Sequence, residues 1–408
     1  MTLTVGRLEI RAWDGVSGGL LTSDPYAVES LTSYVEAGGY RDVADLPRRL
    51  EETHLRGRGG AAFPLARKLA AVRSQHGRPV VVANGEEGEP GSLKDRYLML
   101  HRPHLVLDGL RLMARETDAH RAIVYVSDPR VEQAIRIAIE DSEAFWDVPI
   151  ELFRVAHTYV AGEESALVRA IDGGPALPTA KPPRAFERGI GGAPTLVQNV
   201  ETLAHVARIA SGCAADTFLA TVTGAGFEPA LLEVPFGTPL RSLVGLTGDL
   251  RGVLAGGLFG GLLREPWDTA LSYDTFRAIG SGLGCGSFAL LGPDDCPVDA
   301  AADAVTYLSN ESSRQCGVCI NGTAGMRDVL AGLRVGTTTP DDITRMTGWT
   351  QKLPGRGACA LIDAASRTAA SLLREFPDEV EAHLAGRCPR CAALGALPRH
   401  TRNHLEIT

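Results

Sequence analysis

The chain has 408 residues, enough for two or three domains, and 44% of them are hydrophobic, so each domain can bury a core. The formal net charge of −8 forms no basic stripe, which argues against nucleic acid as a partner. No apolar stretch approaches the length that spans a bilayer, and the N-terminus lacks the pattern of a secretory signal, so we expect a cytoplasmic protein with no direct membrane span.

The first half of the chain alternates between strand-like and helical segments. Short apolar runs typical of buried strands alternate with stretches of helical period, and Pro64 suits the first turn of the helix that follows it. We expect strands at 79–83, 122–126 and 149–155, a strand-like segment at 158–160, and helices at 65–72, 97–114 and 131–139. Strands that alternate with helices imply a mostly parallel, layered sheet whose ligand site lies where the strands end in loops.

The rest of the chain divides into two further regions. Short strands and turns begin near residue 213, and helical periodicity dominates from about residue 299. We therefore expect an α/β domain at 1–212, a small α+β module at 213–298 and a helical domain at 299–408. Of the eight cysteines, only Cys213 lies in the first two-thirds of the chain, which points to a metal-binding C-terminal domain.

The first candidate binding loop is the glycine-rich run Gly57-Arg58-Gly59-Gly60. Residues without Cβ let backbone N–H groups approach a ligand, and the helix after the loop adds its positive N-terminal end, so the loop can receive a phosphate. Lys68 lies one turn inside that helix, within reach of an anion. For an isolated glycine cluster, a tight surface turn is the alternative interpretation.

Two further loops offer carboxylates to a ligand. The first contains Asn84, Glu86, Glu87 and Glu89, and the second contains Gly162, Glu163 and Glu164. Solvated surface loops often carry such charges. The first loop, however, comes directly after a buried strand, where α/β ligand sites occur. Carboxylates at that place accept hydrogen bonds from ribose or ribityl hydroxyls, away from the phosphate end of a nucleotide.

The cysteines supply a candidate metal site. Cys316 and Cys319 form a Cys-x-x-Cys pair, and Cys359 lies beyond it. Clustered thiolates hold iron and sulfide, although a lone Cys-x-x-Cys divides between zinc, redox and packing roles. Cys213, Cys285 and Cys296 read as structural, as most isolated cysteines do.

Taken in order, these features resemble the flavoprotein (NADH-binding) subunit of respiratory complex I and related subunits of soluble NAD(P)H-dependent iron–sulfur oxidoreductases. The matching segments are LRGRGGAAFP, NGEEGEPGSLKDR, YVAGEESALV, AKPP, GGAPTLVQNVETLA, VPFGTPLRSL, GSGLGCG, ESSRQCGVCINGTAG and GACAL. The resemblance implies a layered, Rossmann-like FMN-binding domain, a small β-grasp (soluble-ligand-binding) module and a C-terminal helical domain with a [4Fe–4S] cluster.

The resemblance also implies which residues bind the cofactors. Flavin contacts are expected at Gly57, Gly59, Gly60, Lys68, Asn84, Glu86, Gly162, Glu163 and Asn199. Contacts to the nicotinamide nucleotide are expected at Phe63, Glu89, Glu164 and Lys181. Arg58 and Glu87 lie in the same two loops and are included among the cofactor-binding residues. Outside this context Phe63 would be a packing residue and Lys181 a solvated lysine.

Three positions depart from the family pattern. Ala71 and Arg184 stand where the family has aromatic residues, so two rings that stack on adenine are missing. An arginine pairs well with a 2′-phosphate, so both NADH and NADPH are candidate substrates. Ser313 replaces the first cluster cysteine, and we expect either Ser313 or Cys388 to complete the shell of Cys316, Cys319 and Cys359.

The resemblance implies an enzyme, an NAD(P)H dehydrogenase. Hydride passes to FMN, and single electrons pass through the cluster to a ferredoxin or another iron–sulfur subunit. No side chain is required as an acid or base for hydride transfer. Two alternatives remain: a non-catalytic flavin-binding or assembly relative, and a cysteine site that holds zinc. The direction of electron flow is also open.

Overall fold

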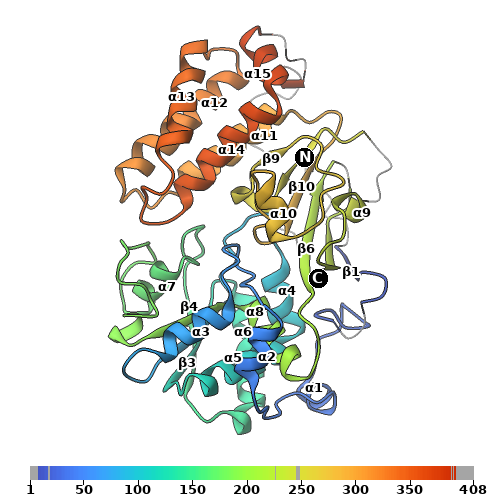
Figure 1. Ribbon diagram of the computed structural model, residues 1–408, viewed down its shortest axis with the longest axis vertical. Helices are drawn as coiled ribbons and strands as arrows, with labels where there is room; N and C mark the ends of the chain where they lie inside the picture. The colour runs from blue at the N-terminus through green and yellow to red at the C-terminus, as the bar shows by residue number, and fades with distance from the viewer. Residues whose placement is uncertain are drawn as a thin grey trace.

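The computed structural model describes residues 8–16, 19–225, 227–244, 249–386, 388 and 390–391. It contains a parallel α/β domain, a second sheet and a helical bundle, which lie at the bottom, right and top of Figure 1. The predicted fold class, with its α/β first domain, small middle module and helical C-terminal domain, is confirmed.

The first domain is built on a four-stranded parallel sheet. Its strands lie in the order β4 (Ile150–Arg154), β3 (Arg121–Val126), β2 (Val80–Asn84) and β5 (Thr195–Asn199). Its helices are α1 (Leu31–Glu36), α2 (Leu46–Glu52), α3 (Leu65–Arg73), α4 (Lys94–His101), α5 (Pro103–Glu116), α6 (Pro129–Asp141), α7 (Glu164–Ile171) and α8 (Val200–Ala210), with 3₁₀ turns η1 (Glu143–Phe145) and η2 (Ile190–Gly192). The strands read as continuous apolar runs because both faces of a parallel sheet are covered.

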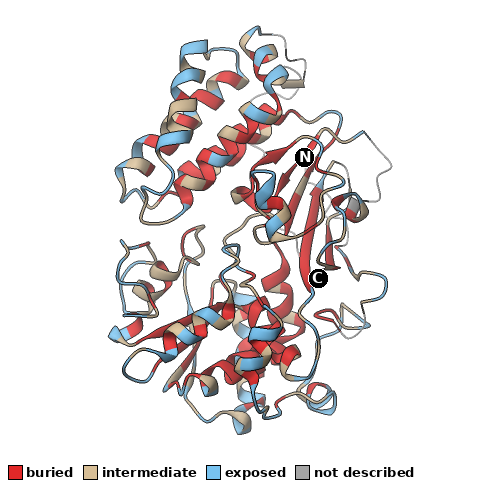
Figure 2. Cartoon of the chain, viewed as in Figure 1, coloured by how far each residue is buried: buried red, intermediate tan, exposed pale blue. Residues whose placement is uncertain are grey.

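Alternate residues of β2 supply two different cores. Val81 and Ala83 pack on one face in the large core that includes residues of α5 and α8. Val80 and Val82 pack on the other face with Leu167 of α7. Buried residues run through the sheet strands and the inner faces of the helices, as Figure 2 shows, so the loops at the strand ends rest on a rigid scaffold.

The middle module is a six-stranded mixed sheet. Its strands are β1 (Glu9–Ala12), β7 (Ala230–Pro235), β6 (Thr217–Gly224), β10 (Ser287–Leu291), β8 (Gly252–Ala255) and β9 (Leu262–Leu263), in that order. The module also contains α9 (Leu240–Val244), η3 (Gly257–Phe259) and α10 (Tyr273–Ala278). Because β1 pairs in parallel with β7, the N-terminal strand extends this sheet, although we predicted residues 1–212 as part of the first domain.

The C-terminal domain is a bundle of helices. It consists of α11 (Pro297–Asn310), the π-helical segment η4 (Val318–Thr323), α12 (Ala324–Arg334), α13 (Pro340–Lys352), α14 (Leu361–Glu375) and α15 (Pro377–Leu384). Leu308, Leu330, Met346 and Ile362 are fully buried in its core. None of the helices in the described part of the chain combines the length and apolar character that a bilayer crossing requires.

The three strands predicted in the first domain are confirmed, and two predicted elements differ. The helix expected at 97–114 is interrupted between α4 and α5. Pro103 disfavours helical geometry at the preceding residue, and Arg102 accordingly has φ −129° and ψ 46°. The segment 158–160 is a turn rather than a strand, and its Tyr159 backbone N–H donates to the Glu311 carboxylate at 2.8 Å instead of joining a sheet.

Candidate cofactor-binding site

The glycine loop, both acidic loops and the start of α8 meet at the carboxyl end of the parallel sheet, which we call the carboxyl-end site. Asn84 ends β2, Asn199 ends β5, and the two residues are register partners. The Asn84 side-chain amide donates to the Gly162 carbonyl at 2.8 Å, which fastens the second acidic loop to the first. A Cβ on Gly59 would lie 3.3 Å from the Asn199 Cβ, so the glycine loop lies against the end of β5. Segments far apart in sequence therefore converge where the sequence places a ligand.

Some of these glycines are required by the protein itself. A Cβ on Gly88 would lie 2.7 Å from the Tyr159 carbonyl oxygen, and one on Gly162 would lie 2.8 Å from the Glu86 carbonyl oxygen. Gly60 has φ +101°, a conformation that disfavours other residues. A Cβ on Gly57, by contrast, would meet its nearest protein atom, the Phe63 carbonyl oxygen, at 3.6 Å. Protein packing thus leaves room beside Gly57, as expected of a loop that cradles a ligand.

Arg58 is buried, and its side chain joins the first domain to the middle module. Its guanidinium donates to the Ala215 and Thr217 carbonyl oxygens at 3.2 and 3.1 Å and lies 4.6 Å from the centre of the Phe236 ring. The Arg58 backbone N–H donates to the Thr202 hydroxyl at 2.9 Å. The structure therefore gives the Arg58 side chain a role in holding the loop, which the sequence did not indicate.

A buried polar network supports the loop from below. The Lys94 ammonium lies 2.6 Å from an Asp95 carboxylate oxygen and 3.1 Å from a Glu201 carboxylate oxygen. Asn199 donates to Asp95 at 2.7 Å and accepts from the Glu201 backbone N–H at 3.0 Å, which caps the start of α8. Asn199 is thereby held in one orientation. Lys94 and Asp95 lie in a segment that matches the family, but sequence reasoning gave them no role.

The three glutamates of the first acidic loop have different surroundings. Glu87 accepts from the Ser92 hydroxyl and from the Asp95 and Arg96 backbone N–H groups, so its carboxylate caps the start of α4. The Glu86 carboxylate is buried 2.7 Å from the His157 Nδ1 atom. Burial raises the pKa of Glu89 from 4.5 to about 8. Glu87 therefore serves the helix, whereas Glu89 holds a proton at neutral pH.

The Glu89 carboxyl group lies against the middle module. One of its oxygens accepts from the Leu258 backbone N–H of η3 at 3.1 Å. This carboxyl group also contributes to the raised pKa of the Cys285 thiol, after burial as the main cause. Cys285 belongs to the glycine-rich segment at 280–286, which approaches Gly60 through Gly284. The middle module thus forms part of the surroundings of the carboxyl-end site.

The second acidic loop contributes two ion pairs. Glu163 caps α7 by accepting from the Ser165 and Ala166 backbone N–H groups, and it also pairs with the Lys181 ammonium. Glu164 pairs with Lys68 at 2.7 Å, and the Lys68 ammonium also donates to the Val197 carbonyl at 2.8 Å. Lys68 thereby connects the glycine loop, the second acidic loop and β5.

The expected nucleotide contact Phe63 is exposed. Its side chain is 53% accessible, a large apolar surface for a position between a glycine loop and a helix. Arg184 is exposed as well, and its backbone N–H donates to the Glu187 carboxylate at 2.7 Å. Ala71 is partly buried on α3. An exposed ring and an exposed guanidinium suit contacts with a mobile substrate better than packing roles.

Cys316, Cys319 and Cys359 come together and form the three-cysteine site. The Cys319 backbone N–H donates to the Cys316 carbonyl at 3.0 Å, and the Cys316 sulfur accepts from the Ala358 backbone N–H at 3.4 Å. Burial first, and then the neighbouring Cys359 and Cys316 thiols, raise the pKa of Cys319 to about 11. Negative charge on three adjacent thiolates is costly unless a cation offsets it, which is what a metal site provides.

The three-cysteine site adjoins the carboxyl-end site. Glu163 raises the pKa of the Cys359 thiol and Lys181 lowers it, although burial is the largest cause of its shift. Across the same boundary, Gln315 accepts from Arg169 of α7 at 3.1 Å and donates to the Pro178 carbonyl at 2.8 Å. Side chains of the second acidic loop therefore lie close to a candidate cluster ligand.

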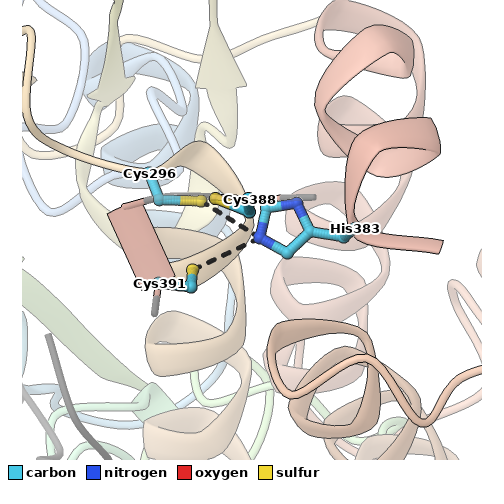
Figure 3. Close-up of side chains that lie close together, drawn as sticks. All are labelled: Cys296, His383, Cys388 and Cys391. Atoms are coloured by element: carbon cyan, nitrogen blue, oxygen red, sulfur yellow. Dashed lines mark hydrogen bonds between the residues drawn. The ribbon is translucent and has the colours of Figure 1, made fainter. Parts of the chain in front are cut away.

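Cys388 belongs to another group of ligands, so its predicted place beside Cys316 is corrected. Its sulfur, the sulfurs of Cys296 and Cys391 and a ring nitrogen of His383 all lie within 4.8 Å of one another, as Figure 3 shows. We call these four residues the Cys₃His group. Cys296 directly precedes α11, a helix of 14 residues and hence about 21 Å long, whereas Cys316 follows its other end.

Ser313 is partly buried in the loop before Cys316, at the position of the missing family cysteine. The neighbouring Ser312 hydroxyl hydrogen-bonds with the Cys319 thiol and lowers its pKa, against the raising effect of burial. Sequence reasoning assigned no role to Ser312, and it read Cys296 as structural and overlooked His383. Only the Cys-x-x-Cys spacing of Cys388 and Cys391 signalled the Cys₃His group, because its four ligands come from three separated segments.

Comparisons with known proteins identify the family. The model of the Nuo51 FMN-binding domain matches residues 50–208, and that of the NADH-ubiquinone oxidoreductase-F iron–sulfur binding region matches residues 299–383. The NADH-quinone oxidoreductase F subunit 2 of Rhizobium meliloti (strain 1021) is 30% identical over 402 residues, which cover 88% of this chain and 96% of that protein. The chain belongs to the family of NADH-quinone oxidoreductase F subunits.

Further relatives agree with this assignment. The NADH-quinone oxidoreductase F subunit of Mycobacterium tuberculosis (strain CDC 1551 / Oshkosh) is 30% identical over 378 residues, covering 83% of this chain and 85% of that protein. A crystal structure of an NAD⁺-reducing [NiFe]-hydrogenase in the H₂-reduced state superposes with a TM-score of 0.77 at 26% identity, covering 88% of this chain and 67% of that one. The predicted resemblance and the predicted oxidoreductase class are confirmed.

The residues present fit the two groups that the matching family models name. The first match contains the glycine loop and both acidic loops, where the open space beside Gly57 and the anchored Asn84 and Asn199 suit FMN. The second match contains Cys316, Cys319 and Cys359, whose thiols suit an iron–sulfur cluster with Ser313 or an external group as the remaining ligand. The chain thus has an FMN-binding domain and an iron–sulfur-binding region.

Proposed function

We propose that this chain oxidises NADH or NADPH at FMN held in the carboxyl-end site and passes single electrons to an iron–sulfur cluster held by Cys316, Cys319 and Cys359. Bound FMN supplies hydride acceptance and two-to-one electron conversion, and the cluster supplies one-electron acceptance. The observation that carries the proposal is the proximity of Glu163 and Lys181 to the Cys359 thiol. It brings the flavin-binding loop and a cluster ligand together within one chain.

The chain's own residues orient the reactants. In this proposal Gly57, Gly59 and Gly60 admit the phosphate end of the flavin, and Asn84 and Asn199, each already fixed by hydrogen bonds, meet its polar edge. Lys68 offers a positive charge that its pair with Glu164 holds in place. The isoalloxazine ring is then approached from the side of Phe63.

Glu89 contributes a proton rather than a charge. Its raised pKa keeps the carboxyl group neutral at pH 7, so it can donate a hydrogen bond near the flavin without repelling the phosphates of the nucleotide. The two sites are linked at Tyr159, whose backbone N–H donates to Glu311 at the end of α11. This bond helps to fix the distance over which an electron moves.

Arg184 supports the use of NADPH. Its exposed guanidinium replaces an aromatic residue of the family and can pair bidentately with a 2′-phosphate. If it does so, Arg184→Ala will raise the KM for NADPH roughly tenfold and leave that for NADH unchanged, because one charged contact of this kind contributes about 1.5–3 kcal/mol. Arg188→Ala is the matched control, since Arg188 is exposed in the same segment. Equal KM values for NADPH in all three proteins would assign Arg184 to the surface.

We propose a ferredoxin or another iron–sulfur subunit in the cytoplasm as the electron acceptor. The cluster ligands lie in loops at one end of the helical bundle, and Gly317 and Ile320 beside them are exposed. Exposed residues around a cluster allow a partner to approach within electron-transfer distance. Iron–sulfur partners are common to the proteins that this chain resembles, whereas the individual acceptor is part of the proposal.

One experiment tests the function as a whole. The chain is purified without oxygen and titrated with NADH and separately with NADPH, while absorbance follows the flavin and electron paramagnetic resonance follows the cluster. We expect the flavin bands to bleach and a reduced-cluster signal to appear in the same titration. Flavin that neither nucleotide reduces would indicate a non-catalytic flavin-binding relative, and material without inorganic sulfide would indicate that the three cysteines bind another metal.

A further inference from the structure

The Cys₃His group assembles four metal-binding side chains from three parts of the chain. Cys296 lies in the turn between β10 and α11, His383 lies on α15, and Cys388 and Cys391 follow α15. Figure 3 shows the three sulfur atoms gathered on one side of the imidazole ring. Cys296 and His383 are buried, and the other two are partly buried. Residues so distant in sequence do not meet in this way by local chain geometry.

The spacing of the four ligand atoms matches one metal ion. Four ligands in a tetrahedron at about 2.3 Å for sulfur and about 2.0 Å for nitrogen are separated by about 3.5–3.8 Å. The Nε2 atom of His383 lies 3.5 Å from the Cys296 sulfur and 3.2 Å from the Cys391 sulfur, and no pair in the group exceeds 4.8 Å. Thiolates of a [4Fe–4S] cluster bind different iron atoms and lie farther apart, so the group is too compact for a second cluster.

The histidine is oriented as a metal ligand. Its Nδ1 atom lies 2.7 Å from the Glu379 carbonyl oxygen, which can only accept a hydrogen bond. The Nδ1 atom therefore carries the proton, and the Nε2 atom presents its lone pair to the three sulfurs. A second hydrogen bond of this kind fixes the tautomer and the ring orientation of histidines that bind metals.

We propose that Cys296, His383, Cys388 and Cys391 bind a structural Zn²⁺ ion. Three thiolates and one imidazole in a closed tetrahedral shell are a donor set that zinc prefers, and no position is left open for catalysis. The group is separate from the three-cysteine site, because α11 and α14 each run from one to the other. Helix α14 has 15 residues and is about 22 Å long, with Cys359 before its start and His383 beyond its end.

The zinc ion anchors the segment after α15 to the junction between the middle module and the helical bundle. Two arginines already bridge this junction: Arg390 donates to the Pro293 carbonyl at 3.1 Å, and Arg251 donates to the Asp295 carbonyl at 2.8 Å. Both also approach the Glu379 carboxylate. The ion adds a covalent-like crosslink there, and it fixes the start of α11, whose far end carries Glu311.

Elemental analysis of the full-length protein tests the proposal. The wild-type chain, purified without oxygen or chelator, is analysed for zinc, iron, inorganic sulfide and FMN. We expect about one Zn²⁺ per chain in addition to the iron. His383→Ala and Cys391→Ala should each lower the zinc content by roughly tenfold or more, because each removes a ligand, while iron and FMN remain.

Two control variants separate the zinc site from the rest of the chain. Cys316→Ser should lose iron and keep zinc, and Cys213→Ser, a change at an isolated cysteine outside both groups, should keep both metals. Zinc missing from the wild-type protein, zinc retained by both ligand variants, or zinc lost together with iron in Cys316→Ser would each overturn the proposal.

Cobalt provides a test that does not require the ligand variants to fold. Wild-type and Cys316→Ser proteins produced with Co²⁺ in place of zinc should both show the intense visible bands of a tetrahedral cobalt thiolate, since the Cys₃His group is intact in each. A weak octahedral spectrum, or no bound cobalt, would contradict a Cys₃His tetrahedron. Because these readouts do not involve NADH, failure here is distinguishable from failure of the proposed dehydrogenase activity.

Discussion

The carboxyl-end site and the three-cysteine site are stabilised in different ways. Around the first, Glu87, Glu163 and Asn199 each cap a helix, and Asn84 ties two loops together, so the protein's own hydrogen bonds fix the side chains. At the second, burial and the neighbouring thiols disfavour the thiolates that a cluster needs. We infer that the flavin loops are organised before the cofactor binds, whereas the cysteine loop depends on its metal.

The sharpest way to separate the two sites is to remove one of them. Cys319→Ser deletes a proposed cluster ligand that lies in the core of the helical bundle. We expect loss of the cluster and a fall of roughly 100-fold or more in electron transfer to a one-electron acceptor, because the flavin loses its outlet. Flavin reduction by NADH, followed by stopped-flow absorbance, should remain within about twofold of wild type.

The outcome that contradicts the comparison is a joint loss. If Cys319→Ser also removes FMN from the chain, the carboxyl-end site is not organised independently of the metal. Gly317→Ala is a suitable control in the same loop, because a Cβ there meets no atom within 4 Å and the residue has helical φ and ψ. This variant should retain both cofactors.

The preformed loops should be sensitive to the loss of a buried charge. Arg58→Met removes the guanidinium that connects the glycine loop to Ala215 and Thr217, and it leaves Glu201 with less positive charge nearby. Breaking a buried pair of this kind costs roughly 3–5 kcal/mol, so chemical denaturation should show a clearly reduced midpoint.

A neighbouring arginine provides the control for this stability effect. Arg56 pairs with Asp274 at 3.0 Å, but that carboxylate is largely exposed. Arg56→Met should therefore cost only about 0.2–1 kcal/mol. Equal losses in the two variants would mean that burial of Arg58 does not determine its contribution.

The contrast between the two sites also explains what the sequence could predict. Strands β2, β3 and β4 are short apolar runs, and the site lies at their carboxyl ends because parallel strands place their following loops together. The meeting of Asn84 with Gly162, and of Cys316 with Cys359, followed from recognised segments in a known order. Local pattern and family resemblance were sufficient for these features.

Individual side-chain roles were less predictable. Glu87 and Glu89 are two residues apart in one acidic loop, yet one caps α4 and the other is a buried, protonated carboxyl group. Which carboxylate turns toward a helix depends on where α4 and η3 pack, and sequence spacing does not contain that information. The same holds for Arg58 and for the Cys₃His group, whose Cys296 lies far from its partners in the chain.

Gly57 tests whether the glycine loop meets a ligand. A Cβ at this position approaches no protein atom closer than 3.6 Å, so Gly57→Ala should leave the thermal stability of the flavin-free protein nearly unchanged. If the loop cradles FMN, the added methyl group should weaken FMN binding about tenfold, which corresponds to about 1.4 kcal/mol. Equilibrium dialysis or fluorescence titration measures the affinity.

A packing glycine gives the matched comparison for Gly57. A Cβ on Gly162 would lie 2.8 Å from the Glu86 backbone oxygen, so Gly162→Ala should lower both FMN affinity and the stability of the flavin-free protein. An FMN affinity of Gly57→Ala equal to that of wild type would show that the space beside this residue faces solvent rather than the cofactor.

The smallest effect concerns the pH dependence introduced by Glu89. Its pKa is raised from 4.5 to about 8 in the folded chain, so between these values the folded state holds a proton that the unfolded state has released. The stability contributed by this proton is fully present below pH 4.5 and is lost as the pH rises through about 8. In Glu89→Gln the side chain is neutral in both states, so we expect the melting temperature of the variant to gain on wild type as the pH rises across this window. Glu36→Gln, at an exposed position of α1, controls for the loss of one charge. A difference between Glu89→Gln and wild type that stays constant from pH 5 to pH 9 would mean that the Glu89 carboxyl group is ionised throughout, and that the first acidic loop presents a charge to the cofactor instead of a proton.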